Sequence, residues 1–288
     1  MAQELKSAIG KSLPKPSLAN RIMDSDSHKP AQDVLDKALF DAISKSSCEE
    51  IQTLLAKGAD PNSLDGKTNT PLMNAISPHI RDRMDIIELL VSHGADVNIL
   101  RKDGKFTALM IAGQIGDYEI CKFLLEHGAD PNAKKNDGTT ALMMSTRDER
   151  VCEMMLDHGA KVNSRSKVKY TALLHAALMG YSLSCELLIK RGAHINARDE
   201  FNRTPLMLAA HGGHAQACKV LLKHGANHLI KNSYDGKTAY EMAMEKQFPQ
   251  RDFETILVLF IPIAMSSMLG KKMKMFMNLF RECISTGV

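Results

Sequence analysis

The sequence has no tryptophan, few aromatic residues and only a small excess of positive charge. Aromatic residues make up 5% of the 288 residues, and the formal net charge is +4. A charge this small does not indicate a nucleic-acid-binding protein, which would carry a denser basic surface and a recognised reader motif. We therefore do not expect nucleic acid to be the partner.

A long apolar run is also missing. The longest nearly uninterrupted apolar stretch, residues 256–269, spans about 14 residues and contains Pro262, whereas a membrane-spanning helix needs roughly 20. The N-terminus is charged from Glu4 onward and has no apolar core of a secretory signal. These features predict an intracellular protein without a transmembrane segment, cytoplasmic and with the nucleus as a further location.

Signatures of catalysis are absent from the sequence. It contains no glycine-rich phosphate loop, no paired-carboxylate motif and no nucleophile elbow. We predict that the protein is not an enzyme and uses no cofactor or metal. An enzyme within the last 40 or so residues is the alternative, but that segment is short and offers no acid–base pair.

The chain does contain one short sequence motif that is repeated six times. A leucine-rich run ends on Gly-Ala, usually followed by Asn three residues later, and the glycines are separated by 36, 34, 31, 33 and 33 residues. A period near 33 indicates a stack of small units, none of which buries its apolar face alone. The repeat glycines are Gly58, Gly94, Gly128, Gly159, Gly192 and Gly225.

Each unit carries signals for two helices and a projecting turn. A threonine can cap the first helix, because its side chain accepts a hydrogen bond from an early helical N–H. The repeat glycine can end the second helix in a left-handed conformation. Asp-Gly dipeptides such as Asp137-Gly138 predict a hairpin-like loop before the next unit. The capping threonines are Thr70, Thr107, Thr140, Thr171, Thr204 and, in a degenerate copy, Thr238.

This order of helix, turn, helix and hairpin resembles the ankyrin repeat over residues 34–260. The resemblance implies an all-α fold, an ankyrin-type α-solenoid of helix-turn-helix repeats with projecting β-hairpin loops and C-terminal capping helices. We expect a flexible arm over 1–30 and an ankyrin repeat domain over 31–260. That domain would hold about six to seven repeats, the first and last degenerate. A helical cap or partner-binding segment would follow over 261–288.

Two repeats differ in length from the others. The second has an enlarged turn at residues 77–83, and the fourth is trimmed around residues 146–148. Neutral variation in loop length would account for such differences, and so would a local change of the binding surface. Both interpretations stay open here.

Cysteine and histidine fall into columns of the repeat. Four cysteines each lie seven residues before a repeat glycine: Cys121, Cys152, Cys185 and Cys218. Stacked helices lie roughly 8–10 Å apart, too far for a disulfide, so we expect free, buried thiols and a reducing compartment. His93, His127, His158 and His224 directly precede a repeat glycine, which suits a helix C-terminus. A metal site is the alternative in both columns.

The segments between each repeat asparagine and the next threonine vary most between copies. In the six segments, Lys and Arg together exceed Asp and Glu by 7, whereas the excess in the whole chain is 4. Since aromatic residues and arginine often anchor interfaces, we predict that these segments bind a partner. The alternative is that the basic loops only keep the stack soluble. The predicted partner-binding residues are Arg101, Lys102, Lys105, Phe106, Lys134, Lys135, Arg165, Lys167, Lys169, Tyr170, Arg198, Phe201, Arg203 and Tyr234.

We therefore predict a monomeric protein–protein interaction module, an adaptor or scaffold, that binds an acidic or extended segment of a partner through its concave groove and hairpin tips. The alternative is a bacterial effector delivered into a host cell to bind and modulate a host protein. Asn98 and Asn132 resemble asparagines that ankyrin repeats offer to hydroxylases, although a structural role is the main expectation. Residues 263–282 could instead contact a membrane surface, and residues 285–288 resemble a PDZ ligand.

Overall fold

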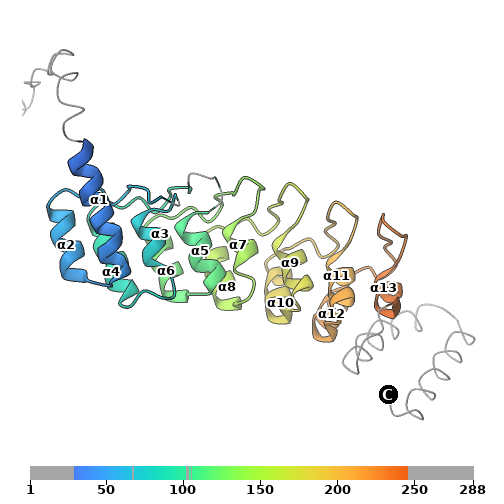
Figure 1. The fold of residues 1–288 in the computed structure, drawn as a ribbon. Helices are drawn as coiled ribbons and strands as arrows, with labels where there is room; N and C mark the ends of the chain where they lie inside the picture. The colour runs from blue at the N-terminus through green and yellow to red at the C-terminus, as the bar shows by residue number, and fades with distance from the viewer. Residues whose placement is uncertain (1–28, 67, 102–103, 105, 246–288) are drawn as a thin grey trace, which may run out of the picture.

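The computed structural model describes residues 29–66, 68–101, 104 and 106–245. Thirteen helices lie in these ranges, where β pairing is limited to one isolated bridge between Lys134 and Thr140. The helices form successive pairs stacked in a row, and the loops that join the pairs project from one edge of the row (Figure 1). The predicted all-α, ankyrin-type solenoid is confirmed.

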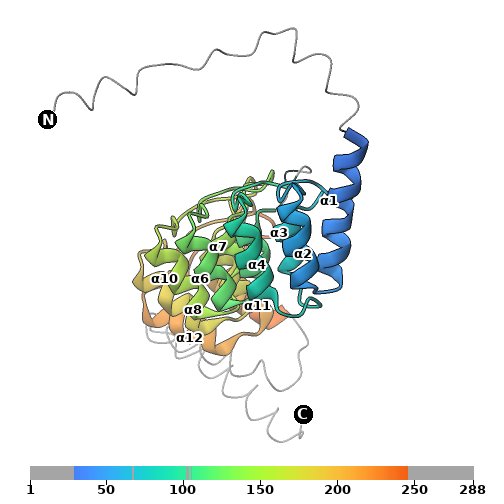
Figure 2. The same cartoon turned by 90° about the vertical axis from the view of Figure 1, so that its left-hand side faces the viewer.

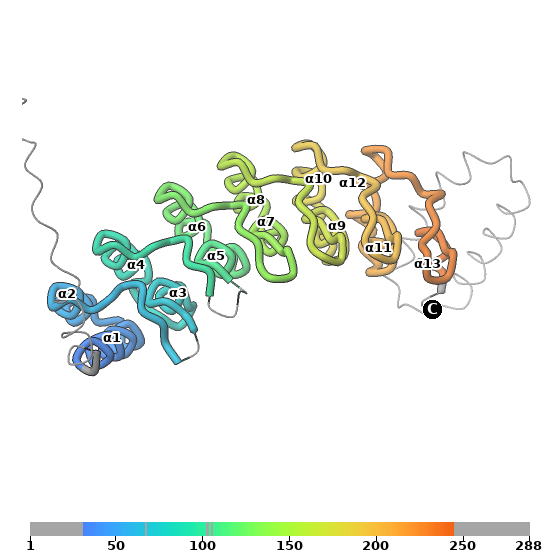
Figure 3. The backbone as a smooth tube through the Cα atoms, turned by 90° about the horizontal axis from the view of Figure 1, so that it is seen from above, coloured from blue at the N-terminus to red at the C-terminus, as the bar shows by residue number. Residues whose placement is uncertain are grey.

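Seen from above, the two helices of each pair belong to two rows, and the stack bends as a shallow arc with the first helices on its inner side (Figure 3). The first helices are α1 (Lys29–Ser44), α3 (Pro71–Ala75), α5 (Ala108–Ile115), α7 (Ala141–Met144), α9 (Ala172–Leu178), α11 (Pro205–Gly212) and α13 (Ala239–Glu245). The second helices are α2 (Cys48–Ala56), α4 (Arg83–Ser92), α6 (Tyr118–Glu126), α8 (Glu149–Asp157), α10 (Ser182–Lys190) and α12 (Ala215–Lys223). We number the pairs as repeats 1 to 6, and α13 begins the next repeat.

The predicted threonine caps are present at five of the described helices, and at α13 the Thr238 Oγ1 atom accepts the Glu241 N–H at 3.4 Å. The Oγ1 atoms of Thr70, Thr107, Thr171 and Thr204 each accept the backbone N–H three residues later at 3.3 Å. Thr140 differs, since its hydroxyl makes no cap bond and α7 after it is only 4 residues long. The trimmed repeat 4 therefore has the least regular first helix of the stack.

The repeat glycines end the second helices as predicted. Their φ angles lie between +83° and +94°. A Cβ at any of the six positions would meet no atom within 4 Å. The left-handed conformation, rather than lack of space, is what selects glycine there.

The cysteine column lies in the core. Cys121, Cys152, Cys185 and Cys218 are free thiols with 0% exposure, which confirms their predicted packing role. Burial raises the pKa of Cys121, Cys185 and Cys218 to about 12 and that of Cys152 to about 11. These thiols stay protonated and unreactive near neutral pH, because the thiolate is the reactive form.

Asparagines tie each repeat to the next. The Nδ2 of Asn98 donates to the carbonyl oxygen of Gly128 at 2.9 Å, and its Oδ1 accepts the N–H of Asp130 at 2.8 Å. The same pair of bonds runs from Asn62, Asn132 and Asn163 to the following repeat. We expected these asparagines to have a structural role by stabilising their own hairpin; the role is structural, but these bonds join each repeat to the next.

Helix α1 supplies the same two bonds without an asparagine. Gln32 Nε2 donates to the Gly58 carbonyl at 3.0 Å, and Asp36 Oδ1 accepts the Asp60 N–H at 2.8 Å. Gln32 also donates to Asp36 at 2.8 Å. Two side chains of α1 thus make the two bonds that a single asparagine makes in the other repeats. They do so at the N-terminal end of the stack, where α1 packs on α2 and α3 (Figure 2).

Both unusual turns contact neighbouring repeats. In the enlarged turn of repeat 2, Arg81 N donates to Ser46 Oγ at 3.0 Å, and Arg83 pairs with Asp117 at 2.8 Å. In the trimmed repeat 4, the Thr146 carbonyl accepts the Ser184 hydroxyl at 2.7 Å. Residues at or beside both turns therefore help to join neighbouring repeats.

Several predictions fall outside the described residues. They are the arm over 1–30, apart from its last two residues in α1, the end of the predicted repeat domain over 246–260 and the cap over 261–288. In the part of the chain that the structure covers, no helix has the length and apolarity needed to cross a membrane.

Candidate protein-binding edge

The loops between repeats are closed by the residue seven positions after each repeat glycine. Its N–H donates to the carbonyl oxygen of the residue before the next threonine, as from Asp199 to Arg203 at 3.1 Å and from Ser166 to Tyr170 at 2.9 Å. We call these segments loops 1 to 6. They comprise residues 62–70, 98–107, 132–140, 163–171, 196–204 and 229–238.

Neighbouring loops are also bonded to each other at their tips. Lys167 N donates to the Asp137 carbonyl at 2.7 Å, Glu200 N to Val168 at 3.2 Å and Ser233 N to Phe201 at 3.0 Å. A similar bond joins loops 2 and 3, from Asn136 N to Gly104 at 2.8 Å. Loops 2 to 6 therefore form one continuous edge, which we call the hairpin edge.

Two of the four predicted aromatic residues pack within the chain. Phe106 is half-buried between two cations, with Arg101 at 5.3 Å and Lys135 Nζ at 4.7 Å from its ring centre. Tyr170 meets His175 edge-on at 6.4 Å between ring centres, and burial raises the pKa of its hydroxyl to about 12. Both rings help to join loops and helices of the stack.

The other two aromatic residues face solvent. Phe201 in loop 5 is 44% exposed and Tyr234 in loop 6 is 86% exposed. They stand on adjacent tips, because Phe201 O accepts the N–H of Ser233, the neighbour of Tyr234. Exposed aromatic side chains on a fixed backbone are common anchors of protein interfaces.

The predicted basic residues divide in the same way. Lys134, Arg165, Lys167, Lys169 and Arg198 are exposed along the hairpin edge. Arg101, Lys135 and Arg203 are only half-exposed, and Lys135 also lies 3.4 Å from Asp137. Lys102 and Lys105 lie outside the described residues.

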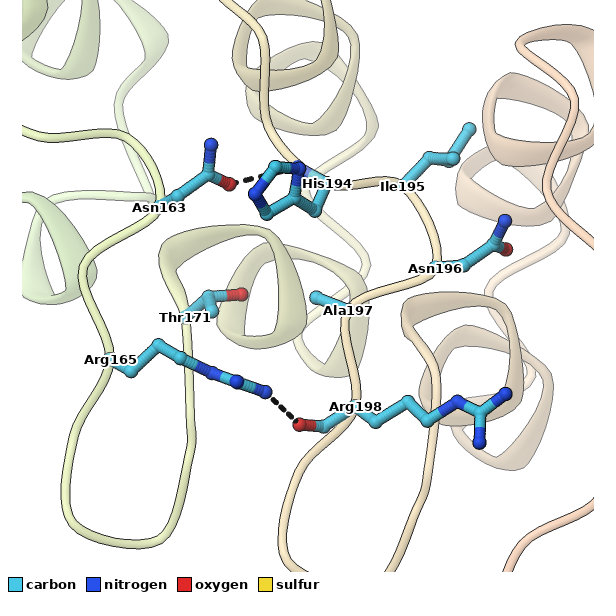
Figure 4. Close-up of a pocket in the computed structure, with 8 residues that line it drawn as sticks. All are labelled: Asn163, Arg165, Thr171, His194, Ile195, Asn196, Ala197 and Arg198. Atoms are coloured by element: carbon cyan, nitrogen blue, oxygen red, sulfur yellow. Dashed lines mark hydrogen bonds between the residues drawn. The ribbon is translucent and has the colours of Figure 1, made fainter.

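A cavity of about 630 Å³ lies between loops 4 and 5 (Figure 4). Arg165 reaches across it and donates from Nη2 to the Arg198 carbonyl at 2.7 Å. The Arg198 guanidinium points away from Arg165, toward the next repeat (Figure 4). Arg165 thus joins two loops, while Arg198 offers its charge to the surface. The lining residues are Asn163, Arg165, Thr171, His194, Ile195, Asn196, Ala197 and Arg198.

A second cavity of about 380 Å³ lies beside the two exposed aromatic residues. It brings together three predicted residues, Phe201, Arg203 and Tyr234, with residues of α11 and α13. Its lining residues are Phe201, Arg203, His211, Asn232, Tyr234, Asp235 and Met242. We call it the loop 5–6 pocket.

Sequence reasoning missed the residue that organises this pocket. Asp199, whose side chain is 2% exposed, accepts Arg203 Nε at 2.7 Å, Arg203 N at 2.8 Å and Phe201 N at 2.9 Å. Asn232, the equivalent residue of loop 6, accepts Tyr234 N at 2.9 Å. The signal was available, because both side chains stand seven residues after a repeat glycine and can bond their own loop.

Comparison with known proteins agrees with this architecture. A family model described as ankyrin repeats (3 copies) matches residues 39–135 and 133–199, and one described as ankyrin repeats (many copies) matches residues 188–243. The chain belongs to the ankyrin repeat family. Ankyrin repeats are generally protein–protein interaction modules, and the family is typically non-enzymatic.

Two relatives illustrate how this ankyrin repeat protein compares with larger proteins. It is 42% identical over 79 residues to a 2-5A-dependent ribonuclease of Mus musculus, covering 27% of this chain and 10% of the relative. It is 36% identical over 74 residues to the ankyrin repeat and KH domain-containing protein mask-1 of Caenorhabditis elegans, covering 26% of this chain and 3% of the relative. The similarity to the ribonuclease involves only its ankyrin region.

The histidine column has a structural role in these ankyrin repeats. The Nδ1 atoms of His93, His127 and His158 donate to the carbonyl oxygen four residues earlier, at 2.8–2.9 Å. His224 differs, with its Nε2 at 4.0 Å from Glu186. Within the described ranges, no three His, Cys, Asp or Glu side chains form a group that could hold a metal ion.

The two candidate hydroxylation sites belong to the asparagine ladder. Asn98 is exposed and Asn132 half-buried, and both side-chain amides are engaged by the following repeat. An enzyme that acted on either would have to displace two hydrogen bonds. Hydroxylation of these residues stays a prediction.

Proposed function

We propose that the protein is a non-enzymatic adaptor that binds another protein through the hairpin edge and the concave face beside it. The observation that carries this proposal is the set of exposed basic and aromatic side chains on a backbone fixed by tip-to-tip hydrogen bonds. Binding to a fixed surface loses less conformational entropy than binding to loops that must first become ordered.

The charge on the edge supports a partner with an acidic or extended segment. Lys134, Lys167 and Lys169 are exposed without an ion pair to a described residue, and opposite charge on a partner would speed encounter and set its orientation. We propose that the protein acts as a monomer in the cytoplasm. The free, buried thiols of the cysteine column support a reducing compartment.

A pull-down from a eukaryotic cell lysate with two matched charge variants tests the proposal. In the edge variant, Lys134, Lys167 and Lys169 are all changed to Glu. In the control variant, three exposed lysines away from the hairpin edge, Lys57, Lys122 and Lys223, are changed to Glu. Both variants undergo the same change of net charge.

We expect proteins captured by the unchanged chain to be lost from the edge variant and kept by the control variant. Circular dichroism should show the same helical content in all three proteins. Capture that survives in the edge variant, or that is lost equally in both, would contradict the proposal. The effector alternative concerns the source and delivery of the chain and stays a prediction.

A further inference from the structure

One position of the repeat changes character along the sequence. Nine residues after the repeat glycine, loops 1 to 3 carry charged residues, Lys67, Asp103 and Asp137. Loops 4 to 6 carry Val168, Phe201 and Tyr234 at the same position, exposed by 46%, 44% and 86%. The backbone bonds between tips place these three side chains in one row. Such a row contributes little to folding, because it remains in water.

The loop 5–6 pocket opens beside this row. Phe201 and Tyr234 form part of its lining on adjacent tips, while His211 of α11 and Met242 of α13 line it from the helices. Its volume of about 380 Å³ can take one or two side chains but not a helix, which is about 10–12 Å wide. A concave, partly apolar site with a few fixed polar groups is the usual form of a binding pocket.

Arg203 gives the pocket its charge. Its Nε is held by the buried carboxylate of Asp199 at 2.7 Å, and its guanidinium lies 5.1 Å from the Phe201 ring centre. Among the described residues, its two terminal Nη groups have no hydrogen-bond partner. The other acid of the pocket, Asp235, is paired with Lys237 at 2.9 Å. Arg203 therefore keeps N–H donors for an acceptor from outside, and a carboxylate is the acceptor it binds best.

We propose that the loop 5–6 pocket binds an extended peptide segment that inserts a large apolar side chain beside Phe201 and Tyr234 and gives a neighbouring carboxylate to Arg203. This rests on the proposed function and names the chemistry of the partner. The site lies at the C-terminal half of the hairpin edge, away from Phe106, whose ring is already covered by Arg101 and Lys135.

The spacing of the tips favours one backbone conformation for the segment. Successive repeats lie roughly 8–10 Å apart, and a polyproline-II segment brings a side chain back to the same face every three residues, about 9 Å. Apolar side chains three residues apart would therefore meet successive tips, Val168, Phe201 and Tyr234. An acidic residue beside one of them would meet Arg203.

Selection from a random dodecapeptide library displayed on phage, against the full chain, tests the proposal. We expect enriched peptides to carry an aromatic or large aliphatic residue next to Asp or Glu, with apolar residues three apart. The leading peptide, made with a fluorescent label, then gives dissociation constants by fluorescence polarisation. Enriched peptides without Asp or Glu would overturn the proposal. Enriched peptides whose apolar residues lie seven apart, as on one face of a helix, would also overturn it.

The variants are chosen so that folding is preserved. Phe201→Ala and Tyr234→Ala remove exposed rings and should each weaken peptide binding about tenfold, as at an interface hot spot, whereas Tyr234→Phe should retain it. Arg203→Lys keeps a cation beside Asp199 but loses the planar set of guanidinium N–H donors. It should therefore weaken binding of the leading peptide about fivefold. A peptide with Asn in place of its Asp should bind Arg203→Lys and the unchanged chain about equally.

Leu183→Ala is the matched control, because Leu183 is a 62% exposed apolar residue on α10, outside the pocket. It should change the dissociation constant less than about twofold. Peptide binding that is lost in the edge lysine variant but unaffected by Phe201→Ala and Tyr234→Ala would overturn this inference and leave the proposed function standing. Peptide binding unaffected by any of these variants would count against both.

Discussion

Gly180 offers the sharpest test of how adjacent repeats are packed. The His214 ring of repeat 6 lies between Gly180 and Gly212, and its Nε2 is 2.9 Å from the Leu178 carbonyl oxygen. A Cβ on Gly180 would lie 2.5 Å from His214 Nδ1, and one on Gly212 would lie 2.5 Å from Cδ2. A Cβ on either glycine would therefore overlap the ring, which must shift to admit one.

Gly180→Ala should destabilise the protein through two separable effects. Gly180 has φ of +74°, and a left-handed alanine costs roughly 1–2 kcal/mol. Displacing the ring adds an overpacking cost of roughly 1–3 kcal/mol. We expect the free energy of unfolding to fall by about 3 kcal/mol in total.

Two further variants separate these effects. Gly128→Ala is the control, because Gly128 has φ of +83° but no atom within 4 Å of an added Cβ; it should cost only the backbone term, about 1 kcal/mol. In a His214→Ala background, Gly180→Ala should cost no more than Gly128→Ala. Urea unfolding is followed by circular dichroism, since the chain has no tryptophan. Equal costs for Gly180→Ala and Gly128→Ala in the unchanged background, or additive costs in the double variant, would refute the packing argument.

Three other predictions concern the loops and the core. Lys169 has φ of +59° where loops 2 and 3 place glycine, so Lys169→Gly should raise the free energy of unfolding by about 1 kcal/mol, measured by urea unfolding, and a loss of stability would contradict this. Thiol alkylation read by mass spectrometry should label Cys48 in the folded chain and spare the buried cysteine column until urea is added. Because burial raises the pKa of those four thiols to about 11–12, the folded state holds their protons more tightly than the unfolded state. The contribution of these thiols to the free energy of unfolding is therefore full below pH about 9 and is lost as the pH rises toward 11–12. A free energy of unfolding that does not change over this pH range would refute the prediction.

Much of the architecture could be predicted from the sequence, because its determinants are local. A threonine side chain caps the helix that follows it, and a glycine adopts the conformation that ends a helix, whatever the rest of the chain does. Thr140 shows the limit of this reasoning, since the trimmed turn after it leaves a first helix of only 4 residues without a side-chain cap. The length of that turn was visible in the sequence, but the loss of the side-chain cap at Thr140 was not.

The candidate site could be predicted only as a set of residues. The sequence placed Phe106, Tyr170, Phe201 and Tyr234 on one edge, in two register positions. Phe106 and Tyr170 directly precede a repeat threonine, whereas Phe201 and Tyr234 lie nine residues after a repeat glycine. The sequence did not show which of the two positions is exposed. That difference arises from neighbours in other repeats: Lys135 lies over Phe106, whereas Tyr234 reaches solvent. The sequence by itself determined the repeat, its caps and its buried columns, because these depend on spacing along the chain. Only the tertiary structure decided which side chains remain free to bind a partner, because exposure depends on what the adjacent repeat places beside them.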